Sequence, residues 1–377
     1  MSAVQERIAA KSEVDVVDAV RSAVRDRAPM RIVGRGGWLD AGNPVEASRM
    51  LDVSGLRGIV EYVPGDLTLT ARAGTTLAEI GDATAAHGQW LPLDPFGDAR
   101  GTLGATLATA SAGPLGGSIG LPRDVTVGIS FVTGTGEDVR GGGRVVKNVA
   151  GFDLVRLTIG AWGTLGIITE ATVRLRARPE VDETVAITLP VERDAVETFL
   201  STVRVAALEP LAAELLSPSR STSVGLGNQA HVLVRLAGNA VGVSHQRATL
   251  AKLASCEPVP NDVWRRLQQS DPAGGCMVRL SRRPTELGRL WSTAMVLGVD
   301  AHATISRGVV RFRPKGDSPY FMSSDATDRV IVEKVPAELR TTTGPDRGAI
   351  DQISRRLRDA FDPVRILNRG ILGDETP

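Results

Sequence analysis

The sequence predicts an α+β fold in which a glycine-rich first half is followed by an α+β insertion and a returning C-terminal helix. Three observations lead to this prediction. Of the 41 glycines in 377 residues, 27 lie in residues 1–180. From about Pro179 onward, short apolar runs alternate with helical stretches. The last stretch, Asp351–Phe361, has the spacing of an amphipathic helix and ends at Asp362-Pro363.

In the first half, caps and apolar spacing place the elements. Ser12 is expected to cap a helix with apolar residues from Val16 to Val24, and Pro29 ends it. Helices are also expected from Thr76 to His87 and from Thr102 to Ala110. The predicted strands are Met30–Val33, Leu51–Ser54, Ile59–Val63, Leu67–Ala73, Val125–Thr133, Thr164–Ile168 and Glu170–Leu175.

The second half alternates strands and helices. The predicted strands are Val181–Pro190, His231–Leu236, Val309–Arg313 and Arg329–Val335. The predicted helices are Arg193–Leu208, Ala248–Leu253, Asp262–Gln269 and the terminal one.

Composition narrows the class of protein. A formal net charge of +1 excludes the basic footprint of a nucleic-acid binder. The N-terminus lacks the apolar region of a signal peptide. The one long uncharged stretch, Gly101–Pro122, contains six glycines and two prolines, so no membrane span is expected. We therefore expect a soluble, cytoplasmic protein. Its two cysteines, Cys256 and Cys276, exclude a disulfide framework and an iron–sulfur or thiolate zinc site built from this chain alone.

The first glycine cluster, Gly34-Arg35-Gly36-Gly37-Trp38, directly follows the strand Met30–Val33. Consecutive glycines can turn several backbone N–H groups inward and form an anion nest, for which a pyrophosphate is the natural guest. The Rossmann fingerprint GxGxxG is absent, because Trp38 and Leu39 follow the glycine pair. The alternative is a plain turn between strand and loop.

Two further clusters contain small residues. In the second, Gly101–Gly113, every side chain from Gly104 onward except Leu107 is small. A flat ligand could lie against such a backbone, although a tightly packed alanine-rich helix is an equal alternative. The third cluster is Gly160–Glu170, and it is preceded by Lys147–Leu154.

The order of residues in these clusters resembles the FAD-binding domain of the vanillyl-alcohol-oxidase-type (PCMH-type) flavoproteins. Within that family, the resemblance is closest to the FAD-binding subunits of bacterial glycolate oxidases (glycolate dehydrogenases). The runs KNVAGFDL at 147–154 and GTLGIITE at 163–170 carry it, with support from Thr102–Ala105 and from Phe361–Asn368. It covers residues 12–180 well, the middle of the chain weakly, and the end by one short motif.

The resemblance implies an architecture. Residues 1–180 form a two-part PCMH-type FAD-binding domain with a break near 57–60. Residues 181–330 form an inserted α+β cap domain with an antiparallel sheet and helices. Residues 331–377 return to the FAD-binding domain.

The resemblance also implies non-covalent FAD and assigns residues to it. Val145–Asp153 would lie near the isoalloxazine ring. The residues expected to bind FAD are Gly34, Arg35, Gly36, Gly37, Trp38, Thr102, Leu103, Gly104, Ala105, Ala108, Thr109, Ala110, Gly163, Thr164, Gly166, Ile167 and Ile168.

The sequence departs from the family at three points. Some members attach FAD through a histidine that follows the glycine pair, where this chain has Trp38. Larger relatives that oxidise D-2-hydroxy acids carry a histidine-rich metal motif, whereas His87, His231, His245 and His302 are isolated here, so no metal site is expected. Only His302, in the expected cap domain, stays an outside candidate for the site. Trp162 replaces a frequent glutamate and either packs by the flavin or fills a core position.

Other charged residues have a functional and a structural interpretation. Lys147 and Asp153 could steer an acidic substrate or tune the flavin, although a structural ion pair is favoured. Arg307, Arg311 and Arg313 alternate on an expected strand and could bind a carboxylate, although a solvated face at a sheet edge is favoured. Arg123-Asp124 is expected to be a structural pair or a cap. No catalytic residue is assigned.

The resemblance implies an FAD-dependent oxidoreductase subunit that acts on a small 2-hydroxy acid of the glycolate type. Electrons would pass to a partner, with a sister flavin subunit and an iron–sulfur subunit expected because this chain cannot hold a cluster. Two alternatives stay open. One is a free-standing FAD-dependent oxidoreductase of another small alcohol or sugar. The other is a non-catalytic FAD-binding assembly subunit, which the lack of an evident general base favours over the first.

Overall fold

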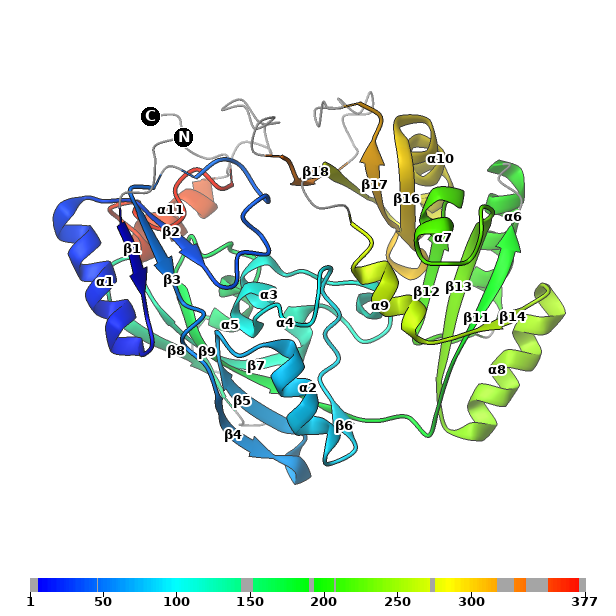
Figure 1. Ribbon diagram of the computed structural model, residues 1–377, viewed down its shortest axis with the longest axis horizontal. Helices are drawn as coiled ribbons and strands as arrows, with labels where there is room; N and C mark the ends of the chain where they lie inside the picture. Colours follow the sequence, from blue (N-terminus) through cyan, green and yellow to red (C-terminus); the bar gives the residue numbers. More distant parts are fainter. Residues whose placement is uncertain are drawn as a thin grey trace.

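The computed structural model describes residues 6–45, 47–143, 152–189, 193–206, 208–271, 275–316, 329–336 and 352–372. These residues form two lobes (Figure 1). The first lobe contains a three-stranded, a five-stranded and a small two-stranded sheet, and the second contains one eight-stranded sheet. No described helix is long and apolar enough to cross a membrane.

A parallel three-stranded sheet begins the first lobe. Its strands, in spatial order, are β1 (Glu6–Ala9), β3 (Arg49–Asp52) and β2 (Met30–Val33). Helix α1 (Glu13–Asp26) covers the sheet and begins at Ser12, whose hydroxyl accepts the N–H of Asp15 at 3.2 Å, so the predicted cap is confirmed. Strand β2 ends where the first glycine cluster begins.

The five-stranded sheet of the first lobe is antiparallel. Its strands, in spatial order, are β4 (Ile59–Val63), β5 (Thr68–Arg72), β9 (Ile167–Arg174), β7 (Thr126–Val132) and β8 (Asp138–Gly142). The helices of this part are α2 (Leu77–Ala85), α3 (Leu103–Thr109), α4 (Pro122–Val125) and α5 (Leu154–Thr158). Strands β6 (Gln89–Trp90) and β10 (Arg176–Ala177) form the small pair. Helix α3 packs in the core of this sheet through Leu103 and Leu107, which fixes its small residues on the opposite side.

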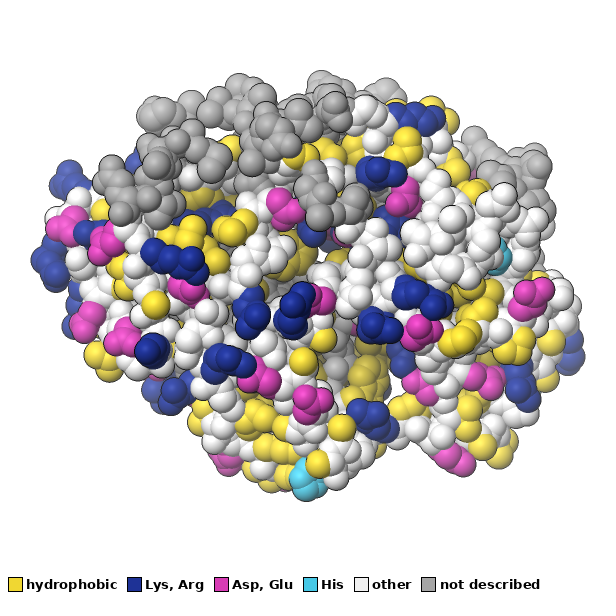
Figure 2. Space-filling view, viewed as in Figure 1, with side chains coloured by type: hydrophobic (Ala, Val, Ile, Leu, Met, Phe, Trp, Pro, Cys, Tyr) yellow, Lys and Arg dark blue, Asp and Glu magenta, His cyan; other side chains and the backbone are white. Residues whose placement is uncertain are grey.

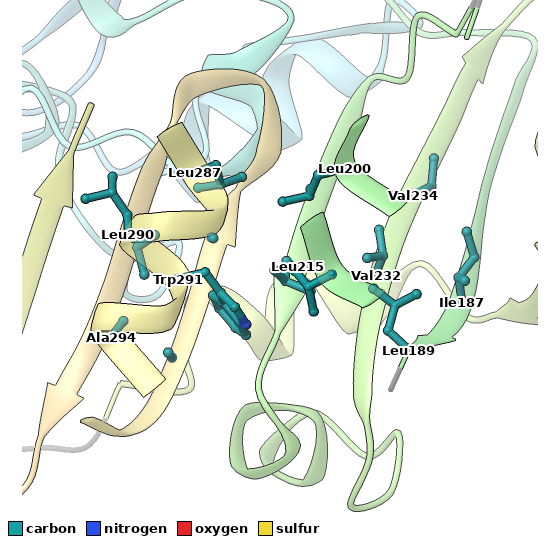
Figure 3. Packing of buried hydrophobic residues seen from close by; sticks show 14 of the residues in the cluster. Ile187, Leu189, Leu200, Leu215, Val232, Val234, Leu287, Leu290, Trp291 and Ala294 are labelled. Carbon is teal, nitrogen blue, oxygen red and sulfur yellow. The ribbon is translucent and has the colours of Figure 1, made fainter. Parts of the chain in front are cut away.

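The second lobe is built on an eight-stranded antiparallel sheet. Its strands, in spatial order, are β14 (Glu257–Val259), β11 (Val181–Leu189), β13 (Ala230–Gly238), β12 (Ala212–Leu216), β16 (Gly298–Thr304), β17 (Val309–Pro314), β15 (Met277–Ser281) and β18 (Arg329–Lys334). The helices are α6 (Arg193–Val205), α7 (Pro218–Ser223), α8 (Ala240–Leu253), α9 (Asp262–Gln268) and α10 (Leu287–Leu297). Trp291 of α10 and Leu200 of α6 face Leu215 and Val232 of the sheet in one apolar core (Figure 3).

The opposite face of the middle strands is charged. Because successive strand residues point to opposite faces, Glu214, His302 and Arg311 leave the sheet on the side away from that core. All three side chains are nevertheless buried. This face is therefore covered by other parts of the chain, including Phe96 of the first lobe.

The C-terminal segment packs on the first lobe. After α11 (Gln352–Phe361), Ile366 and Leu367 enter the core beneath the parallel sheet, and Leu367 bridges to Met30 in β2. Strand β18 links the two lobes, because it pairs with β15 while Lys334 bridges to Ala41.

Some element predictions are wrong. Thr164–Ile168 and Glu170–Leu175 were predicted as two strands, but β9 is a single strand that starts at Ile167, since the backbone turns sharply at Trp162 and Gly163. Helix α8 starts at Ala240, eight residues before the predicted start, because Asn239 caps it. The sequence reading also missed β12, β15, β16 and α10.

Candidate functional site

A cavity of about 560 Å³ opens in the first lobe, within the range of pockets that hold small ligands and cofactors. Three separate segments form most of its wall: the loop after β2, helix α3, and the turn before β9. Lys334 of β18 and Asn368 of the C-terminal segment complete it. Chain segments more than 300 residues apart therefore meet at this one site.

Fourteen of the seventeen residues that the sequence assigned to FAD line this cavity. They are Gly34, Arg35, Gly36, Gly37, Trp38, Thr102, Gly104, Ala105, Ala108, Thr109, Gly163, Gly166, Ile167 and Ile168.

The other three do not line the cavity. Leu103 is fully buried in the core of the five-stranded sheet. Ala110 ends α3 in a left-handed conformation and packs against the same core. The hydroxyl of Thr164 donates to the carbonyl of Ala161 at 2.6 Å.

The loop of residues 34–38 offers free donors. Among the described residues, none accepts a backbone hydrogen bond from the N–H groups of Gly34, Arg35, Gly36, Gly37 or Trp38. Gly36 adopts φ +82°, and a Cβ on Gly34 would lie 2.9 Å from the hydroxyl oxygen of Thr102. Glycine is therefore favoured at both positions, and the loop, which lines the cavity, holds a row of N–H groups without a described backbone acceptor.

Helix α3 contributes a surface rather than donors. Its first N–H groups are already engaged, because Leu103 donates to Thr75, Gly104 to Ala73, and Ala105 to the Thr102 hydroxyl. The side that lines the cavity carries the small side chains Ala105, Ala108 and Thr109. This arrangement suits close contact with a flat group and excludes anion binding by the helix N-terminus.

The turn before β9 is strained and pinned. Trp162 adopts φ +55°, which is unusual for a bulky residue, and Gly163 follows at φ +69°. The N–H of Trp162 donates to Ala108 at 2.8 Å, and its carbonyl accepts from Asn368 Nδ2 at 2.7 Å. Trp162 also packs edge-to-face on Trp38, with ring centroids 6.0 Å apart. Trp162 is also one of the residues that line the cavity.

The charged side chains in the described wall of the cavity are mostly basic. Arg31, Arg35, Arg100 and Lys334 line it, and Asp98 is the one acidic residue among them. Asp98 is paired with Arg100, whose Nε lies 2.9 Å away. Lys334 lies over the ring of Trp38, with Nζ 5.4 Å from its centroid. Such a wall suits an anionic ligand.

Sequence reasoning did not assign several of these wall residues. They include Lys334, Asn368, Arg31 and the loop Pro95–Asp98. A turn at Pro95–Asp98 could have been predicted from the dipeptides Asp94-Pro95 and Phe96-Gly97. No local signal could have placed Lys334, because tertiary pairing of β18 brings it to the site.

The remaining candidates lie elsewhere. Lys147 falls outside the described residues, and Asp153 caps α5 through the N–H of Arg156. The carboxylate of Asp124 accepts the N–H of Leu121 at 2.8 Å, so the predicted role of Arg123-Asp124 as a cap is confirmed. Among the described residues, no group of three His, Cys, Asp or Glu side chains could hold a metal ion.

The three arginines of the second lobe differ from the expectation of a solvated edge. Strand β17 lies inside its sheet, and Arg311 is buried there. Its guanidinium donates to Glu333 at 2.7 Å, to Asp271 at 2.8 Å and to His302 Nε2 at 3.2 Å, so each of its three nitrogens already has a buried partner. Arg313 is exposed. Arg307 lies in the 3-10 turn before the strand and makes no hydrogen bond or ion pair with a described residue.

Two buried acids, Glu214 and Asp94, lie near Arg307. Burial raises the pKa of Glu214 to about 8 and the pKa of Asp94 to about 7. The carboxylate of Asp94 accepts the N–H groups of Gly113 at 3.1 Å and Leu115 at 2.8 Å. Burial and the nearby Arg220 and Arg311 lower the pKa of His302, so the imidazole is neutral.

In the folded protein the pKa of Asp94 lies above its ordinary value of 3.8. Protonated Asp94 therefore favours the folded state, and this contribution to stability is lost as the pH rises through about 7. Between pH 6.5 and 7.5 this loss is expected to lower the free energy of unfolding by roughly 0.7 kcal/mol. Urea unfolding of the wild type and of Asp94→Asn at both pH values measures it. The variant should lack this part of the slope, and equal slopes would contradict the prediction.

Three comparisons relate the chain to known proteins. Residues 5–142 match the family described as FAD binding domain. Glycolate oxidase subunit GlcE of Escherichia coli (strain K12) is 40% identical over 166 residues, which cover 44% of this chain and 47% of that protein. Glycolate oxidase subunit GlcD of Bacillus subtilis (strain 168) is 34% identical over 191 residues, which cover 50% of this chain and 40% of that protein. The chain therefore aligns with less than half the length of either relative. The structure of p-cresol methylhydroxylase with substrate bound shares the fold, with a TM-score of 0.74 and 16% identity over 98% of this chain and 88% of that one.

Proposed function

We propose, from the premise that residues 5–142 belong to the family of FAD-binding domains, that this chain is an FAD-binding subunit of a 2-hydroxy-acid dehydrogenase of the glycolate type. The observation that carries the proposal is the 40% identity to a glycolate oxidase subunit over 166 residues. Further support comes from the basic wall and the free N–H groups of the cavity.

The residues of the cavity fit FAD. A diphosphate needs clustered N–H donors and positive charge, and residues 34–38 with Arg35 and Lys334 supply both. A planar ring system needs close approach, and the side of α3 that lines the cavity carries the small side chains of Ala105, Ala108 and Thr109. When bound, FAD supplies the acceptor for a hydride from the α-carbon of the substrate.

FAD is held non-covalently in this proposal. Trp38 occupies the position at which the resemblance places a linking histidine. None of the described residues in the cavity wall is histidine, cysteine or tyrosine, whose side chains could form a bond to the flavin.

Arg307 does not line the cavity, and it is the candidate in the second lobe for pairing with the substrate carboxylate. Its side chain is half-buried, and burial together with the nearby Arg279 lowers its pKa. A bound anion would stabilise the charged guanidinium in this position. It packs against the 3-10 helix Pro114–Gly117 of the first lobe, where a Cβ on Gly116 would lie 3.0 Å from it. Arg307 therefore lies where the two lobes meet.

A second function has one observation in its favour. Among the described residues of the cavity wall, Asp98 is the only candidate base, and Arg100 already occupies it. This supports an assembly subunit that binds FAD while a sister flavin subunit oxidises the substrate and an iron–sulfur subunit receives the electrons.

The test is an absorbance spectrum of the purified chain, before and after acid precipitation and then after anaerobic addition of glycolate. We expect flavin bands, release of FAD into the supernatant, and bleaching by glycolate that needs a higher glycolate concentration in Arg307→Met. Bleaching only after co-expression with the sister subunits would favour the assembly function. A protein that takes up no FAD, alone or co-expressed, would contradict both.

A further inference from the structure

We propose that Arg311, in the second lobe, is a positioning residue that holds Phe96 in the wall of the cofactor cavity of the first lobe. The inference rests on the proposed function only for the identity of the cofactor. Phe96 is 9% exposed and lines the cavity. The guanidinium of Arg311 lies over its ring, with Cζ 3.6 Å from the centroid.

Arg311 is held in place from several sides. Its three nitrogens donate to Glu333, His302 and Asp271, which come from β18, β16 and the segment after α9. Asp271 also accepts from Arg220, whose Nε donates to Asp300 at 2.8 Å. A guanidinium whose three nitrogens each have a partner in a different segment is held in orientation, so the face that it presents to Phe96 is fixed as well.

His302 shares this task. Since Arg311 donates to Nε2, the proton of the neutral imidazole is on Nδ1 and is donated to Glu214 Oε2 at 2.9 Å. The imidazole ring lies 5.3 Å from the ring of Phe96. Phe96 is therefore held against two rigid polar groups of the sheet.

The loop that carries Phe96 is attached to both lobes. Gly97 donates its N–H to the carbonyl of Gln268 at 2.9 Å, at the end of α9. Asp94 accepts two N–H groups of residues 113–115 in the first lobe. The position of this stretch of cavity wall consequently depends on the ion network of the second lobe.

Arginine is the side chain that this geometry requires. A planar guanidinium can stack on an aromatic face while its nitrogens donate in the plane, whereas a lysine ammonium cannot do both. Arg311→Lys keeps the charge and loses the stack. Phe96→Leu keeps the ion network and loses the aromatic face.

The test compares Arg311→Lys and Phe96→Leu with the control Trp291→Leu. Trp291 is 3% exposed and packs in the apolar core on the opposite face of the same sheet. Three quantities are measured: hydrogen exchange of the amides in residues 95–101, the dissociation constant for FAD with the visible circular dichroism of bound FAD, and the thermal midpoint.

We expect Arg311→Lys and Phe96→Leu to raise exchange in residues 95–101, to weaken FAD binding about tenfold and to change the dichroism. Trp291→Leu should lower the thermal midpoint and leave exchange in this loop and FAD binding as in the wild type. If Arg311→Lys matches Trp291→Leu in exchange and FAD binding, the positioning role is refuted. Hydrogen exchange needs no cofactor. If the wild type binds no FAD and the two variants still raise exchange in residues 95–101, the proposed function is refuted while the positioning of the loop is supported.

Discussion

Replacing Gly104 with tryptophan is expected to abolish FAD retention, with affinity lowered by at least ~100-fold, or about 2.7 kcal/mol. Even a Cβ at this position would lie 2.7 Å from the Cβ and 3.0 Å from the carbonyl oxygen of Ala73. The helix must therefore move away from β5 and into the space of the ligand. Flavin content of the purified variant, read from its absorbance, measures the effect.

Two companion variants separate this effect from misfolding. Ala105→Trp fills the cavity from a residue that lines it, and it should lose FAD while its far-ultraviolet circular dichroism stays unchanged. Gly81→Trp is the control, because nothing lies within 4 Å of a Cβ on Gly81 of α2. Normal flavin content in Gly104→Trp would remove helix α3 from the site.

Replacing Asn368 with leucine is expected to have the second largest effect. Asn368 Oδ1 accepts the N–H of Ile32 at 2.9 Å, and its Nδ2 donates to Trp162 at 2.7 Å. One side chain thus fixes the strand before the glycine loop and the strained turn at Trp162. Leucine leaves two partly buried backbone groups unpaired, so we expect a loss of roughly 2–4 kcal/mol in the free energy of unfolding.

The same variant should bind FAD at least ~10-fold more weakly, because both loops face the cofactor and each loses its attachment. Urea unfolding and a titration with FAD measure the two effects. Asn239→Leu, which removes the cap of α8 in the second lobe, is the control: it should lose about 1 kcal/mol and bind FAD normally. Wild-type FAD affinity in Asn368→Leu would show that the clamp is purely structural.

The sequence carried the local features of the fold. The predicted cap at Ser12 is confirmed, and helices begin directly after Thr76 and Thr102, where helices were expected to start. In all three cases the side-chain hydroxyl accepts an N–H three residues further along. The PCMH-type α+β fold is also confirmed. These predictions hold because a cap, a glycine at positive φ and an apolar period each act within a few residues.

Elements that are buried by segments distant in the sequence could not be predicted in this way. Strand β12 reads as Ala-Ala-Glu-Leu-Leu, a helix-like composition, and it is a strand because β13 and β16 lie on either side of it. Arg311 looked like a residue of a solvated edge, and it is buried because β17 lies between β16 and β15. Strand order is a long-range property that spacing does not encode.

The sequence by itself determined that three glycine-rich segments could admit a phosphate and a flat ring, since the absence of side chains is a local fact. Only the tertiary structure decided that Lys334, Asn368 and Phe96 complete the wall around them. It also decided that residues 34–38, rather than the start of α3, hold the free N–H groups, because Ala73 and Thr75 already accept those of the helix. The physical reason is that an N–H group stays free or finds an acceptor depending on which carbonyl groups the tertiary structure brings next to it.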